Sequence, residues 1–71
     1  MNKGDLVVFS GSYTVYNPLK ERVMIEMNVQ PKQGIVLDID NDKVTVLSTD
    51  DVFCTLQLDD EASQIHVISS V

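Results

Sequence analysis

The chain has little of the material from which catalytic and disulfide-bonded domains are built. Its 71 residues include one cysteine, one histidine and no tryptophan. A single cysteine, Cys54, excludes an intrachain disulfide, and a reducing cytoplasm is the expected compartment. Residues 6–9 form an apolar run that is far too short for a signal-peptide core or a membrane span. We therefore predict a cytoplasmic protein with no targeting segment and no contact with the membrane.

The few residues with chemical potential do not form a known motif. His66 has no second histidine or cysteine pair at metal-ligand spacing, and Cys54 occupies an apolar strand position typical of a buried, inert thiol. Residues 38–42 have an aspartate at every second position, as at the start of an EF-hand calcium loop. Lys43 and Thr49, however, stand where that loop needs its glycine and its bidentate glutamate. The sequence therefore predicts no enzyme activity, no cofactor and no metal.

Charge is unevenly distributed along the chain. The net charge is −6, with about +1 on residues 1–34 and −7 on residues 35–71. The eight acids of the second half are Asp38, Asp40, Asp42, Asp50, Asp51, Asp59, Asp60 and Glu61. We expect them to form an acidic edge that repels nucleic acid and attracts a basic partner. Two interpretations stay open: a solvated edge that limits aggregation, and a nucleic-acid mimic whose carboxylates take the place of phosphates.

Alternation of apolar and polar residues predicts about six antiparallel strands. Asn41-Asp42 suits a type I′ turn that pairs Asp40 with Lys43 and places Leu37 opposite Val46. The other predicted strands are 6–9, 22–29, 52–58 and 65–68, with Val23, Ile25, Met27 and Val29 on one inward face and Val52, Cys54, Leu56 and Leu58 on another. Residues 10–21 are expected to form a long loop with a helical turn at 18–21. Strands this short and this closely connected favour one small, partly open barrel over the whole of residues 1–71.

The strand openings resemble the SH3-like small β-barrel superfamily, including KOW-type domains. Lys3-Gly4-Asp5-Leu6-Val7-Val8-Phe9 is similar to the start of its first strand, and residues 34–39 and 43–47 are similar to its central hairpin. The resemblance implies an all-β, SH3-like, partly open barrel of five to six antiparallel strands. The chain departs from the superfamily where ligands bind. It lacks the tryptophan of signalling SH3 grooves and the basic loops of RNA-binding KOW-type domains. As a short acidic chain it is also similar to accessory proteins of tailed phages.

Two surface features are candidates for partner contact. Tyr13 and Tyr16 fall in the predicted long loop, where tyrosines of small barrels form stacking platforms, although burial of both rings in the core is an equal alternative. Val36 and Leu47 pair on the polar face of the predicted hairpin, either covered by the barrel or exposed as a contact patch.

Together these features predict a non-enzymatic protein-binding module, a monomer or weak dimer, that recognises another protein with a basic surface. Tyr13, Tyr16 and the acidic edge are its predicted contacts. The alternative is a nucleic-acid-mimicking inhibitor, while direct nucleic-acid binding is disfavoured by the charge.

Overall fold

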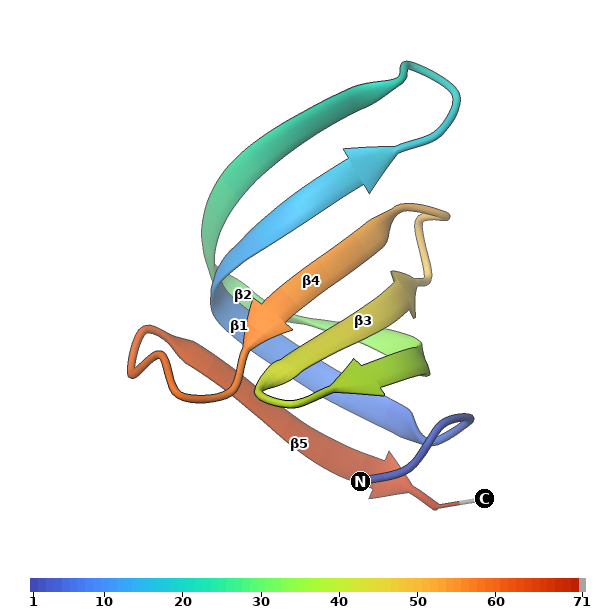
Figure 1. Cartoon of the computed structure of the whole chain (residues 1–71), viewed down its shortest axis with the longest axis vertical. Coiled ribbons are helices and arrows are strands. Elements are labelled where there is room, and N and C mark those ends of the chain that lie inside the picture. The colour runs from blue at the N-terminus through green and yellow to red at the C-terminus, as the bar shows by residue number, and fades with distance from the viewer. Residues whose placement is uncertain (71) are drawn as a thin grey trace.

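The computed structural model describes residues 1–70, apart from the side chains of residues 28 and 29 (Figure 1). Its five strands are β1 (Leu6–Asn17), β2 (Arg22–Asp40), β3 (Lys43–Ser48), β4 (Phe53–Gln57) and β5 (Ser63–Ser69). Strands hold 69% of the chain, and residues 1–70 contain no helix. The predicted all-β fold is confirmed.

Four strands close into an antiparallel barrel. β2 pairs with β3, β3 with β4, β4 with the C-terminal part of β1, and β1 with β2. Two further strand segments lie outside this ring. One is β5, which pairs with the N-terminal part of β1, and the other is the N-terminal half of β2. In Figure 1 this half of β2 curves along the margin of the sheet with β1 beside it.

The segment predicted as a long loop belongs largely to β1, so that prediction is wrong. Strand pairing continues to Asn17, and residues 18–21 form a turn instead of a helical turn. Gly11 makes the continuation possible at a register shift, with a φ of 95°. A Cβ at Gly11 would lie 1.8 Å from the carbonyl oxygen of Ala62. Only glycine therefore lets the connection before β5 cross β1 this closely.

β2 continues through Pro31, although the sequence prediction ended the strand before this residue. Phe9 pairs with Lys32 and Gly11 with Asn28, so that three residues of β2 face one residue of β1. Pro31 lies in this bulge, where its missing N–H removes no ladder hydrogen bond. The bulge bends β2, and its two halves consequently serve different parts of the sheet.

The β2–β3 hairpin confirms only part of the predicted register. Asp40 pairs with Lys43, as predicted, but a bulge at Leu37 then places Val36 opposite Val46. The predicted pairs of Leu37 with Val46 and of Val36 with Leu47 are therefore wrong. The turn differs too, because Asn41 has a φ of 53° whereas Asp42 does not have the positive φ that a type I′ turn requires.

Alternate residues of β1 to β4 fill the barrel. The buried cluster comprises Val7, Phe9, Tyr13, Val15, Val36, Val44, Val46, Cys54 and Leu56. Cys54 and Leu56 confirm the predicted inward face of β4, but Leu58 lies beyond the strand and is 43% exposed. The N-terminal segment is held to β2, since Gly4 donates its N–H to Val36 at 2.8 Å. β5 contributes no fully buried side chain, which leaves β1 to β4 as the structural body of the domain.

Candidate functional site

Strand register aligns five large side chains across the outside of the barrel. Opposite residues of an antiparallel ladder point to the same face. The pairs are Ile35–Leu47, Leu47–Phe53, Phe53–Tyr16 and Tyr16–Val23. None of the five belongs to the buried cluster. We name Ile35, Leu47, Phe53, Tyr16 and Val23 the outer apolar row.

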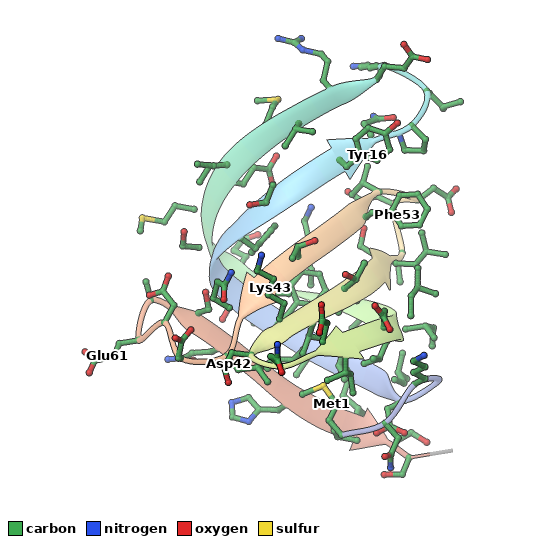
Figure 2. All side chains as sticks on the ribbon, in the orientation of Figure 1. Met1, Tyr16, Asp42, Lys43, Phe53 and Glu61 are labelled. Atoms are coloured by element: carbon green, nitrogen blue, oxygen red, sulfur yellow. The ribbon has the colours of Figure 1, made fainter. Side chains whose placement is uncertain are left out.

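Aromatic contact joins the middle of this row. The rings of Tyr16 and Phe53 are stacked, with centroids 6.2 Å apart and an angle of 27° between their planes. Figure 2 shows both rings at the same end of the barrel, near the β3–β4 turn. The stack forms an aromatic centre of the row, which joins β1 to β4.

The row extends onto the N-terminal half of β2. Val23 is 66% exposed, Ile25 79% and Met27 77%. The prediction that these side chains face inward is wrong, because this half of β2 lies outside the closed ring and nothing in residues 1–70 forms a second layer over its outer face. Ile25 and Met27 pair with Thr14 and Ser12, which continue the same outer face on β1.

The turn between β1 and β2 is fixed by its own polar groups. The side-chain oxygen of Asn17 accepts a hydrogen bond from the N–H of Leu19 at 3.0 Å. The backbone carbonyl of Asn17 accepts another from the backbone N–H of Lys20 at 3.2 Å. Glu21 completes the reversal with a φ of 49°. These contacts set the register that brings Val23 opposite Tyr16.

The two tyrosines do not form the expected platform. They are three positions apart on one strand, so their side chains point to opposite faces of β1. Tyr13 is 3% exposed and packs edge-to-face on Phe9, with centroids 5.3 Å apart. Tyr16 is 39% exposed on the outer face. Tyr13 is therefore a core residue, and of this pair only Tyr16 is placed to contact a partner.

The acidic residues do not lie along one edge. The N–H of Leu58 donates to the carbonyl of Asp42 at 2.6 Å, which joins the β2–β3 turn to the β4–β5 connection. This end of the barrel carries Asp40, Asp42, Asp59, Asp60 and Glu61, and we name these residues the acidic end; Figure 2 shows Asp42 and Glu61 there, far from Tyr16 and Phe53. Asp50 and Asp51 lie in the β3–β4 turn at the opposite end of β3. The predicted continuous edge is thus divided by the length of the barrel.

Two of the other acids are paired with lysines. Asp38 lies 3.4 Å from the Lys3 ammonium, and Asp50 accepts a hydrogen bond from Lys32 at 3.2 Å. The hydrogen bond from the Ser48 hydroxyl, followed by the contact with Lys32, holds the pKa of Asp50 below its usual range. Partial burial works against a charged Lys32, but the carboxylate of Asp50 raises its pKa overall. Both groups are therefore charged near neutral pH and compensate each other.

A small cavity of about 260 Å³ adjoins this ion pair. Its charged lining is mixed, with Lys20, Arg22 and Lys32 facing Glu26 and Asp50. Glu26 also lies 4.0 Å from the Lys32 ammonium. Opposite charges in one cavity cancel the field that an anionic or cationic ligand would need.

The single cysteine is buried and the single histidine is exposed. Cys54 is fully buried, and burial raises the pKa of its thiol to about 11. A thiol with this pKa is protonated and a poor nucleophile near neutral pH, which confirms the predicted inert cysteine. His66 is exposed on β5, beside a shallow cavity of about 530 Å³ that Met1 and Ile65 also line.

Within residues 1–70, no three metal-ligating side chains come together. None of the described segments is a helix of the length and apolarity that a membrane crossing needs.

Sequence reasoning missed most of the outer apolar row. Leu47 was predicted as half of a contact patch and does lie in the row, but its predicted partner Val36 is 1% exposed. Nothing in the sequence pattern predicts a surface role for Phe53, Val23 or Ile35. The chain length carried a signal of exposed apolar residues, because a 71-residue barrel is too small to bury every apolar residue that its strands supply.

The fold and this surface define a small all-β barrel with an apolar strip on its outer face. No protein-family model, no curated protein and no solved structure matches the chain.

Proposed function

We propose that this chain is a non-enzymatic protein-binding module whose contact surface is the outer apolar row together with Ile25 and Met27. The observation that supports the proposal is the alignment of five large apolar side chains on the outside of four paired strands. Small soluble domains seldom expose a contiguous apolar strip unless it meets a partner. We also propose that the barrel is of the SH3-like type, with which the closed four-stranded ring is compatible.

Energetics favour association through this strip. Full burial of a side chain such as Val, Ile or Met stabilises by about 1.5 to 3 kcal/mol. Val23, Ile25 and Met27 are each at least 66% exposed, so folding of the chain alone realises little of that energy. An aromatic centre with flanking aliphatic groups is typical of the desolvated middle of a protein interface.

The acidic end is the second feature of this chain that the proposed partner would contact. Threonines 45, 55 and 14 form the next cross-strand row, between the outer apolar row and the acidic end. A partner with an apolar patch and a basic rim would match this order along the strands. The nucleic-acid mimic stays a second candidate, because five acids gather at one end, and among the described residues none of them forms an ion pair.

Affinity capture with two matched variants separates these candidates. Val23→Thr combined with Ile25→Thr removes apolar surface but keeps β-branched side chains in β2. Asp42→Asn, Asp59→Asn and Glu61→Gln together neutralise the acidic end. Asp60 is left intact because its carboxylate caps the connection by accepting the N–H of Ala62 at 2.9 Å.

We expect the wild-type chain to retain a protein at low and at high salt, and the double threonine variant to lose it. The charge-neutralised variant should retain the same protein with slightly lower affinity, because charges at the rim contribute less than the buried apolar centre. Loss of the protein on neutralisation or in high salt would favour the mimic instead. A wild-type chain that retains no more protein than the double threonine variant would contradict the proposed surface.

A further inference from the structure

The N-terminal half of β2 presents an open strand edge. Residues 22–28 pair with β1 along one side, and the described part of the chain places no strand on the other (Figure 1). Natural proteins protect such edges with charges, proline or a covering segment, because unpaired N–H and C=O groups recruit another strand. Arg22 and Glu26 lie in this segment, but Val23, Met24, Ile25 and Met27 make most of it apolar, and each of these four is at least 50% exposed.

The sequence of this edge is complementary to itself. A two-fold axis normal to the sheet pairs residues of equal orientation, so the axis must pass through a residue of β2. With the axis at Met24, Arg22 of each copy faces Glu26 of the other. Val23 then faces Ile25, and Met24 faces itself. Opposite charges and apolar pairs directly across a ladder each stabilise it.

Neighbouring registers lack this complementarity. With the axis at Val23, Arg22 faces Met24, and Glu26 meets Lys20, which lies in the turn outside β2. With the axis at Ile25, Glu26 faces Met24 and Arg22 faces residue 28. Only the axis at Met24 forms two Arg–Glu pairs within the strands.

We propose that a second copy of this chain pairs with the edge of β2 in an antiparallel, two-fold arrangement centred on Met24. The two sheets join into one, β4-β1-β2-β2-β1-β4, and Val23 of one copy continues onto Ile25 of the other. The Glu26 side chain lies beside Lys32 but is still 39% exposed, so its carboxylate is accessible to Arg22 of the other copy. This inference concerns the edge of β2 and does not depend on the proposed function, which concerns the outer face.

Cysteine crosslinking reads the register directly. Met24→Cys places two thiols opposite each other across the axis, with their Cβ atoms about 5 Å apart. Met27→Cys is the control, because residue 27 is more exposed than residue 24, at 77% against 50%, but lies about 20 Å from its own copy in this register. The native Cys54 is fully buried and does not interfere. With oxidised glutathione, we expect a disulfide dimer from Met24→Cys to form at least tenfold faster than one from Met27→Cys.

Charge reversal tests the same register without a covalent bond. Arg22→Glu places glutamates opposite each other twice, and Glu26→Arg does the same with arginines. A mixture of the two variants restores both opposite-charge pairs. In sedimentation equilibrium we expect a wild-type dimer, a dimer weakened about tenfold or more in each single variant, and a heterodimer in the mixture. Lys20→Glu, which changes the same charge in the adjacent turn, should leave the dimer intact.

Several outcomes overturn the inference. A wild-type chain that stays monomeric at millimolar concentration excludes this dimer. Faster crosslinking of Val23→Cys or Ile25→Cys than of Met24→Cys places the axis elsewhere. Single variants that dimerise as well as the wild type, or a mixture of them that does not, show that Arg22 and Glu26 do not face each other. A monomeric wild type that still retains a partner through the outer apolar row would leave the proposed function standing.

Discussion

Replacing Val46 and Val23 by threonine, one at a time, compares two valines that a sequence pattern places in the same class. Val46 on β3 is fully buried, whereas Val23 on β2 is 66% exposed. Threonine has nearly the shape of valine and the same β-branching, so strand propensity is retained. The difference between the variants therefore reports burial alone.

The structure makes the two costs unequal. Val46→Thr loses the burial of one methyl group, about 0.8 kcal/mol, and places a hydroxyl in an apolar site at a further cost of about 1 to 3 kcal/mol. We expect a loss of about 2 to 4 kcal/mol from a total stability of roughly 4 to 10 kcal/mol. Val23→Thr removes a methyl that is mostly in water already, and its expected cost is about 0.3 kcal/mol.

Urea unfolding followed by far-ultraviolet circular dichroism measures both values, since the chain has no tryptophan to report by fluorescence. With a slope near 1 kcal/mol per molar urea, Val46→Thr should lower the midpoint by roughly 2 to 4 M and Val23→Thr by a few tenths of a molar. Low micromolar protein keeps self-association out of the measurement.

Equal losses at every protein concentration would refute the reasoning, because Val23 would then be buried within its own chain and the outer apolar row would not be a surface. A cost at Val23 that appears only as the concentration rises would instead belong to the dimer through β2.

Three further predictions concern backbone, charge and thiol. Gly11→Ala should destabilise by at least about 3 kcal/mol in the same urea assay, since a positive φ and a backbone clash add together; a loss below 1 kcal/mol would show that the crossing at β1 can relax. Asp50 has a lowered pKa through Ser48 and Lys32, so its contribution to stability is complete above the unfolded pKa and disappears as the pH falls through the folded one. Between pH 6 and pH 2 the wild type should therefore lose more stability than Asp50→Asn, and parallel curves would contradict this. Cys54 should resist a thiol reagent at pH 8 until urea unfolds the chain, because burial raises its pKa to about 11; rapid labelling of the native protein would show that the core opens.

Local pattern alone determined the all-β class, the β2–β3 hairpin and the inward face of β4. On these short strands Val44, Val46, Cys54 and Leu56 alternate with residues that are half-buried or exposed. This period of two is the pattern of a strand with one buried face. The same alternation misled on β2. Val23, Ile25 and Met27 have the period of a buried strand, but the period does not say whether a second layer covers the face.

Long-range pairing decided the rest. Gly11 and Pro31 indicate breaks in a local reading, yet both lie at the bulge where β1 and β2 pass each other, so β1 and β2 continue through them. The outer apolar row exists only because β1, β2, β3 and β4 pair in one particular register, which brings Phe53 opposite Tyr16 across 37 positions of sequence. The eight acids are close in sequence but occupy both ends of the barrel, since each strand carries the chain from one end to the other. Composition therefore set the amount of apolar and acidic surface, and the closure of the sheet set where each of them lies.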